Sequence, residues 1–189
     1  MHVTTCDAMA GLSVPSVEVP TTAEVYAAHG RIVWRVLRRL GVPESEIEDA
    51  AQEVFVVVHR KLAGFAGRSS LRTWVCGIAV RCALEHRRRH ARREEPTDGI
   101  DLAATDATPI EALEQREARA MLERILASLD DTKRAVFVLY ELEGLSMNEV
   151  AEVVGCPLQT AYSRLHAGRA HVDAAVARMT ARAKSEGVR

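Results

Sequence analysis

The sequence contains few aromatic residues and no apolar run long enough to cross a membrane. Aromatic side chains make up 4% of its 189 residues, so aliphatic side chains must supply most of any core. A membrane-spanning helix needs about 20 consecutive apolar residues, which are absent, and the N-terminus lacks the basic-then-apolar pattern of a signal peptide. We therefore expect a cytoplasmic protein that does not associate with a membrane.

Sequence motifs of enzymes and metal sites are also lacking. There is no glycine-rich phosphate loop and no credible Ser-His-Asp arrangement. His86 and His90 are four residues apart, but no cysteine or carboxylate stands at a spacing typical of a zinc site. The four cysteines show no CxxC pair, which suits reduced thiols: Cys6, Cys76, Cys82 and Cys156. We expect no catalytic residue, no metal and no cofactor.

A formal net charge of −1 hides a strong separation of charge along the chain. Between Arg60 and Arg93 ten basic residues stand against the single acid Glu85, so this segment can neutralise phosphate. Between Glu94 and Glu117 eight acids stand against one base, and a second acidic cluster lies within residues 44–53. Because these acidic segments would repel nucleic acid, we expect them to face a different partner.

Helical patterns account for the first half of the chain. Thr21 and Glu24 form a capping box that begins a helix ending at Gly41, and Ser45 with Glu48 repeats the box before a second helix. Residues 64–70 form a loop, after which Ser70 caps a long basic helix. The second helix has a predicted buried face (Ala51, Val54, Phe55, Val58 and Leu62) and an opposite polar face (Asp49, Gln52 and Glu53).

The second half is predicted to hold four more helices. Thr108, Pro109 and Glu111 begin the first of these, which ends near Ser128, and the others cover 132–142, 146–155 and 158–179. The expected fold is all-α, with two small helical domains joined by a flexible acidic linker and a helix-turn-helix in the C-terminal domain. The expected division is a flexible segment 1–20, an N-terminal domain 21–93, the linker 94–110, a C-terminal domain 111–180 and a tail 181–189.

The helix-turn-helix prediction concerns the helices on either side of the turn 155–157. Apolar residues are spaced to pack across this turn: Val150, Ala151, Val154, Leu158, Ala161, Leu165 and Val172. The outward face of the second helix is then Gln159, Thr160, Tyr162, Ser163, Arg164, His166 and Arg169. In a major groove, glutamine suits adenine and arginine suits guanine. An ordinary helical hairpin with a solvated face remains the alternative for this segment.

Taken together, these motifs resemble the extracytoplasmic-function (ECF) sigma factors, the small two-domain branch of the main bacterial sigma family. The resemblance covers roughly 21–175 and is carried by DAAQEVFVVVHRKLAGFAGRSSLRTWVCGIA at 49–79, LSMNEVAEVVG at 145–155 and TAYSRLHAGRA at 160–170. It implies a factor that binds core RNA polymerase, directs it to promoters with minus-10 and minus-35 elements, and helps to open the DNA.

The resemblance also implies roles for individual residues. The expected contacts with the clamp helices of the largest polymerase subunit are Asp49, Gln52, Glu53 and Phe55. The expected minus-10 contacts are Arg68, Ser69, Ser70, Arg72, Trp74, Arg81, Arg87, Arg88 and Arg89, with flipped bases captured on apolar or aromatic surfaces. The expected minus-35 contacts are the outward-facing residues of the helix-turn-helix given above, from Gln159 to Arg169.

Further partners follow from the same resemblance. They are the flap of the second polymerase subunit, double-stranded and melted promoter DNA, and an anti-sigma factor, which many relatives have. The acidic linker resembles the segment that runs through basic channels of the polymerase. Arg81, Tyr162 and Ala167 stand where asparagine, lysine and arginine are usual, so we expect an effect on promoter specificity rather than on the function itself.

Two other classes of protein are the alternatives to this interpretation. A conventional helix-turn-helix regulator, acting without being a polymerase subunit, would explain the C-terminal half but leaves the acidic and basic helices of 44–93 without a purpose. A nucleotide-processing or other enzyme would need the catalytic motifs that the sequence lacks.

Overall fold

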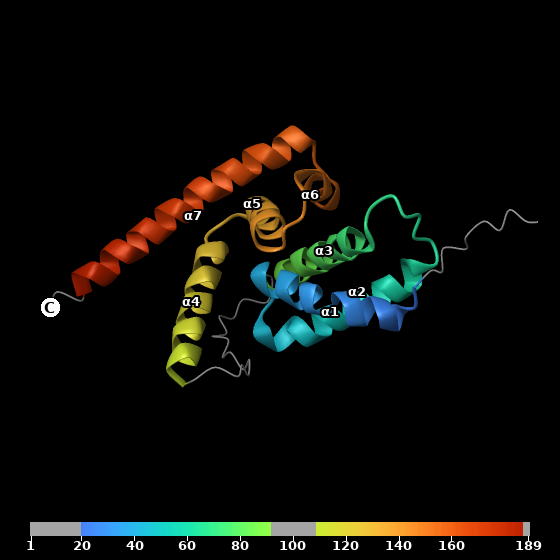
Figure 1. The fold of residues 1–189 in the computed structure, drawn as a ribbon, viewed down its shortest axis with the longest axis horizontal. Coiled ribbons are helices and arrows are strands. Elements are labelled where there is room, and N and C mark those ends of the chain that lie inside the picture. Colours follow the sequence, from blue (N-terminus) through green and yellow to red (C-terminus); the bar gives the residue numbers. More distant parts are fainter. Residues whose placement is uncertain (1–19, 92–108, 187–189) are drawn as a thin grey trace, which may run out of the picture.

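The structure, a computed structural model, describes residues 20–91 and 109–186. All regular elements within these ranges are helical, as expected (Figure 1). The α-helices are α1 (Thr22–Arg39), α2 (Ile47–Leu62), α3 (Leu71–Ala91), α4 (Pro109–Ala127), α5 (Asp131–Phe137), α6 (Met147–Val154) and α7 (Leu158–Glu186). A short 3-10 helix, Glu44–Glu46, precedes α2, and a π-helical turn, Val138–Leu142, continues α5.

The start of α1 follows the predicted capping box. Thr21 accepts a hydrogen bond from the Glu24 amide, and the Glu24 carboxylate accepts one from the Thr21 amide at 2.7 Å. Apolar side chains spaced by three and four residues bury one side of the helix, among them Val25, Ile32 and Val36, whereas Ala28 is exposed. The helix ends in a turn at Gly41, whose φ of 88° lies in the left-handed region that favours glycine.

The predicted start of α2 was wrong. No side chain caps this helix: the 3-10 turn after Pro43 takes the place of a Ser45–Glu48 capping box, and Ile47, fully buried, is the first α-helical residue. The buried face of α2 was predicted correctly, with Ala51, Val54, Phe55, Val58 and Leu62 all buried. Burial of Ile47 against the core, rather than a local cap, therefore decides where this helix begins.

In the C-terminal half, α4 and α6 begin at the positions that the sequence motifs predict. Pro109 is the first residue of α4, as predicted. Thr108, which was predicted to begin this helix together with Pro109, lies outside the described residues. Ser146 and Glu149 form the capping box of α6, and Gly155 ends that helix with a φ of 69°. The last helix, α7, continues to Glu186, beyond the predicted end at Met179.

The two halves pack on opposite sides of α3 (Figure 1). In the figure α1 and α2 lie on one side of α3, while α5 and α6 lie on the other and are covered in turn by α7. One continuous hydrophobic cluster runs from Val36 in α1 through Ile78 in α3 to Val150 in α6 and Leu165 in α7. The sequence predicted two domains joined by a linker, but it gave no sign of this shared interface.

Candidate polymerase and nucleic-acid interfaces

The predicted polymerase-binding face of α2 is partly exposed. Asp49 and Gln52 are exposed, and Val56 beside them leaves 47% of its surface accessible. Phe55, by contrast, is buried, with its ring edge against Tyr26 at a centroid distance of 4.8 Å. Phe55 therefore supports this face from inside, while the polar residues are the ones presented to a partner.

Glu53 of the same face is already bound within the protein. Its carboxylate contacts His86 Nε2 at 3.0 Å and accepts hydrogen bonds from Arg89 at 3.3 and 3.4 Å. Burial opposes ionisation of this carboxyl, but the hydrogen bonds and charges of Arg89 and His86 outweigh it and lower the pKa of Glu53. Glu53 thus links α2 to α3 in addition to lying on the acidic face.

The histidines of α3 are paired with carboxylates. His86 is 6% exposed, and its Nδ1 lies 3.2 Å from Glu46 while its Nε2 faces Glu53. His90 lies 3.5 Å from Glu46. Sequence spacing missed these carboxylates because they come from the segment before α2 and from α2 itself. No group of three or more potential metal ligands forms among residues 20–91 and 109–186.

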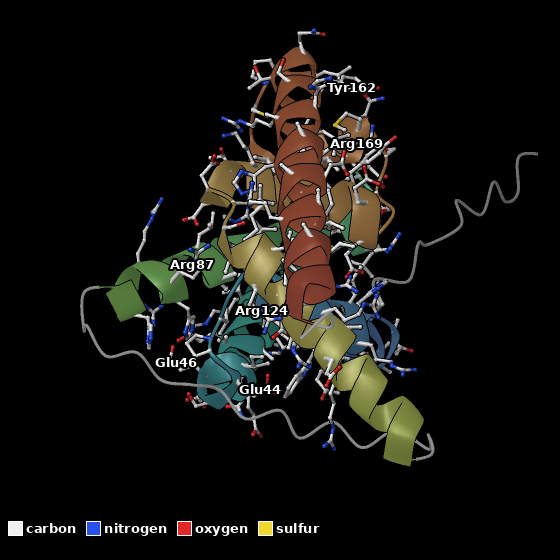
Figure 2. All side chains as sticks on the ribbon, turned by 90° about the vertical axis from the view of Figure 1, so that its left-hand side faces the viewer. Glu44, Glu46, Arg87, Arg124, Tyr162 and Arg169 are labelled. Atoms are coloured by element: carbon white, nitrogen blue, oxygen red, sulfur yellow. The ribbon has the colours of Figure 1, made fainter. Side chains whose placement is uncertain are left out.

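The arginine cluster at the end of α3 is less free than the sequence implied. The segment was expected to neutralise phosphate, yet Arg87 pairs with Asp131 of α5, and Arg89 pairs with Glu53 and Glu85. Figure 2 shows Arg87 at the side of α3 that faces the C-terminal half. Arg88 and Arg81 remain exposed and line an open groove of about 500 Å³ on α3. Of the predicted minus-10 residues on α3, Arg81 and Arg88 are therefore the two most available to DNA.

At the other end of α3, the predicted minus-10 residues contact the C-terminal half. Arg68 in the loop is exposed and Ser69 is half-buried. Ser70 caps the helix, accepting a hydrogen bond from the Thr73 amide at 3.0 Å. Arg72 donates to the backbone carbonyl of Glu143. Trp74 is partly buried against Phe65, with ring centroids 5.1 Å apart, so most of its surface serves packing.

The helix-turn-helix has the predicted geometry with one correction. Ala161 and Leu165 of α7 are buried as expected, but Leu158 is 41% exposed. Leu158 is the first residue of α7, and Cys156 in the preceding turn packs on the core in its place. The remaining apolar residues of the prediction face inward, with Val150 and Ala151 buried and Val154 and Val172 partly buried.

The outward face of α7 presents most of the predicted minus-35 residues. Gln159, Tyr162, Ser163 and His166 are exposed, whereas Thr160 and Arg164 are half-buried. Figure 2 shows Tyr162 near the N-terminal end of α7 and Arg169 further along the same helix. Arg169 is held in place, because its Nε lies 2.5 Å from a Glu141 carboxylate oxygen and its guanidinium stands over the Tyr140 ring at 5.7 Å.

A basic groove between α1 and α4 was missed at the sequence level. It encloses about 670 Å³ and is lined by arginines from both helices together with Trp34 and Tyr26, which are 39% and 56% exposed. The five arginines are Arg31, Arg35, Arg38, Arg39 and Arg119. The helices that form it are distant in the sequence, so no local pattern could have indicated it.

The described helices carry an acidic exposed face, a basic helix and a helix-turn-helix, the combination of surfaces that a transcription factor with both a protein and a DNA partner requires. Residues 25–93 match the family described as Sigma-70 region 2, and residues 119–172 match Sigma-70, region 4. The chain is 30% identical over 142 residues to the ECF RNA polymerase sigma-E factor of Escherichia coli (strain K12), covering 70% of this chain and 74% of that protein. It is 32% identical over 145 residues to the RNA polymerase sigma-H factor of Pseudomonas aeruginosa, with the same coverage. The chain belongs to the ECF branch of the sigma-70 family.

Solved structures agree with this assignment. The fold is similar to that of CnrH in complex with the cytosolic domain of CnrY, with a TM-score of 0.63, 25% identity and coverage of 83% of this chain and 88% of that chain. It is also similar in fold to the sigma factor RpoE in complex with the anti-sigma factor NepR from Bartonella quintana. There the TM-score is 0.66 at 17% identity, with coverage of 82% and 95%.

The family establishes the function. The protein is a sigma factor, which binds RNA polymerase and gives it promoter specificity, and the conventional-regulator alternative is set aside. Sigma factors are initiation factors without enzymatic activity, so the expectation that the chain is not an enzyme is confirmed by family membership. Within the described ranges, no helix is both long and apolar enough to cross a membrane.

Proposed function

We propose that the exposed acidic face of α2 binds the clamp helices of the largest polymerase subunit, with Asp49 and Gln52 as the principal contacts. The main support is that these polar side chains are exposed beside the apolar Val56, on a helix whose opposite face is buried. An apolar centre rimmed by polar groups is the usual composition of a protein interface. The C-terminal domain contacts the flap of the second subunit, and the protein works in the cytoplasm, where core polymerase meets the chromosome.

The minus-35 element is read by the first turns of α7. Gln159, Ser163 and Arg164 lie directly after the left-handed turn at Gly155, where a helix can enter the major groove with its N-terminal end. The loop before α3 and the exposed Arg81 and Arg88 bind the minus-10 region, with basic side chains following the phosphate backbone of the melted strand.

An anti-sigma factor is proposed as a further partner. The groove between α1 and α4 is the surface best suited to it, because both domains contribute arginines and two exposed aromatic rings accompany them. An acidic, amphipathic segment fits this composition, since its carboxylates can pair with the guanidinium groups of Arg31 and Arg119 while its apolar side chains cover Trp34 and Tyr26. A partner seated there would contact both domains at once.

In vitro transcription with core polymerase on a pool of randomised promoters tests the residue-level proposal. Sequencing of the transcribed templates should return two conserved elements at a fixed separation. Variants of Arg164 and Arg81 should change the upstream and downstream element, respectively, and leave the other unchanged. A pool in which both variants select the same two elements as the wild type would contradict these assignments.

A further inference from the structure

Two large apolar side chains at the start of α7 are open to solvent. Leu158 is 41% exposed and Tyr162 is 49% exposed, and because they are four residues apart they lie on the same side of the helix, one turn from each other. Within residues 20–91 and 109–186, no other two large exposed apolar side chains are one helical turn apart. A single exposed leucine is ordinary, whereas an adjacent pair on a DNA-binding helix is a candidate contact surface.

Neither side chain holds α7 in place on the C-terminal domain. That role belongs to Ala161 and Leu165, which are buried where the helix packs on α5 and α6, and to Cys156 in the preceding turn. Among the described residues, the Tyr162 side chain has no hydrogen bond or ring contact. The pair can therefore meet a partner without any rearrangement of the fold.

The pair belongs to the end of α7 that faces promoter DNA in the proposed function. It follows the turn at Gly155 and lies within the segment that matches Sigma-70, region 4. Gln159 and Ser163 are exposed beside it. The Ser163 hydroxyl donates to the Gln159 carbonyl at 3.0 Å, so its hydrogen is used within the helix. This end of the helix thus combines polar groups for base edges with an apolar surface.

Arg169 lies on the same side of α7, at a distance that suits the width of a major groove. It follows Tyr162 by two helical turns, which places it about 10 Å further along the axis (Figure 2). Its guanidinium is fixed, with Nε 2.5 Å from a Glu141 carboxylate oxygen and the charge over the Tyr140 ring. The major groove is about 12 Å wide, so if Arg169 holds a backbone phosphate, the apolar pair lies inside the groove at the base edges.

We propose that Leu158 and Tyr162 read thymine in the minus-35 element by apolar contact with its C5 methyl group. This inference rests on the proposed reading of that element by α7 and adds a base that it selects. Base edges in the major groove offer hydrogen-bond donors and acceptors, and the thymine methyl is their distinctive apolar group. A leucine and a tyrosine ring bury that methyl. A cytosine at the same position lacks it and places an amino group against the apolar pair, so thymine is preferred.

The test removes the methyl group rather than the base. Holoenzyme assembled with the full-length chain first selects its upstream element from randomised templates. Each thymine of that element is then replaced by deoxyuridine, which lacks only the methyl, in duplexes whose downstream sequence is unchanged. Binding is measured for the wild type, for Leu158→Ala with Tyr162→Ala, and for the control Val176→Ala. The control shortens a 40% exposed apolar side chain of the same helix, about 27 Å along the axis from Leu158.

The wild type and the control should lose about fourfold in affinity at one or more deoxyuridine positions, which is the effect of one buried methyl group. The double variant should bind the thymine and deoxyuridine duplexes equally, because the surface that buries the methyl is gone. Tyr162→Phe keeps the ring and should respond to deoxyuridine as the wild type does.

A selected element without A·T pairs, or wild-type binding that ignores every deoxyuridine, would overturn the inference. A double variant that keeps the full deoxyuridine penalty would also overturn it, and so would one that loses affinity for core polymerase instead, since the pair would then belong to a protein interface. The proposed function of α7 fails separately, if the holoenzyme selects no upstream element. An element that Arg164→Ala alters but deoxyuridine does not weaken would overturn only the thymine reading.

Discussion

Arg134 of α5 closes the turn at Gly41 that ends α1. Its Nε donates to the Arg39 carbonyl at 2.6 Å, and the guanidinium is so near that a Cβ at Gly41 would lie 2.7 Å from Nη1. Arg134 is 4% exposed, and burial, with the charge of nearby Arg87, lowers its pKa to about 10. At neutral pH it remains charged, so a buried cation of one half stabilises the main chain of the other.

Gly41→Ala should destabilise the protein more than Gly155→Ala. Both glycines have a positive φ, and an alanine in the left-handed region costs about 1–2 kcal/mol. At Gly155 nothing lies within 4 Å of the added Cβ, whereas at Gly41 it must also displace Arg134. Urea unfolding followed by circular dichroism measures both free energies.

The matched control for these two substitutions is Gly64→Ala. Its Cβ would meet the Lys61 carbonyl oxygen at 3.6 Å, an ordinary contact, and its backbone is not left-handed, so we expect a change within about 0.5 kcal/mol. Equal losses at Gly41 and Gly155 would show that Arg134 moves away without cost.

Substitution of Asp49 and Gln52 should weaken polymerase binding without a change in the stability of the fold. Both side chains are exposed, so Asp49→Ala with Gln52→Ala should weaken binding to core polymerase by about 1–3 kcal/mol per charged hydrogen bond removed, with unchanged thermal unfolding. Glu53→Ala should lower both the affinity for core polymerase and the stability of the fold, because Glu53 also pairs with His86 and Arg89. A pull-down in which the double variant keeps wild-type affinity for core polymerase would rule out this face.

Arg164 and Arg169 should contribute differently to minus-35 recognition. Arg164 makes no ion pair within the described part of the chain, so it is available for a guanine edge, whereas Arg169 is held by Glu141 and stacked on Tyr140. Arg164→Ala should relax preference at one upstream position by about 1–3 kcal/mol. Arg169→Ala should weaken binding evenly and reduce the salt slope by about one unit. Selection from randomised upstream elements with holoenzyme distinguishes them, and identical preferences for Arg164→Ala and wild type would exclude base reading.

Asp130 should make the stability of the C-terminal half dependent on pH. It caps α5 by accepting from the amides of Thr132 and Lys133 at 3.1 and 3.0 Å, and the hydrogen bonds with Lys133 lower its pKa. A carboxyl with a lowered pKa in the folded state stabilises the fold above its unfolded pKa of about 3.9, and this contribution is lost as the pH falls below that value. Asp130→Ala should therefore cost about 1 kcal/mol near neutral pH and less in acid.

Denaturant unfolding of the wild type and Asp130→Ala at several pH values checks this prediction. Asp130→Asn keeps a capping oxygen without the charge. At neutral pH its free energy of unfolding should therefore lie between those of the wild type and Asp130→Ala. A difference in the free energy of unfolding that widened towards acid would contradict the proposed role of the charged cap.

Local sequence signals determined where most helices begin and end. The capping box at Thr21, the helix start at Ser146 and the helix ends at Gly41 and Gly155 were predicted correctly, because a cap involves only residues within about four positions of each other. The motif order was sufficient to indicate the sigma family. The local signals failed where packing overrode them, as at the start of α2, where burial of Ile47 replaced the expected cap.

Tertiary structure alone decided which charges meet. The sign and density of charge in each segment follow from the sequence, but Arg35 and Glu143 are 108 residues apart, and only the packing of α1 and α6 against α3 brings them together. The same packing pairs Arg87 with Asp131 and so neutralises part of a cluster that, read linearly, was assigned wholly to DNA. Pairing across an interface depends on the positions of whole helices, which no pattern within a single helix encodes.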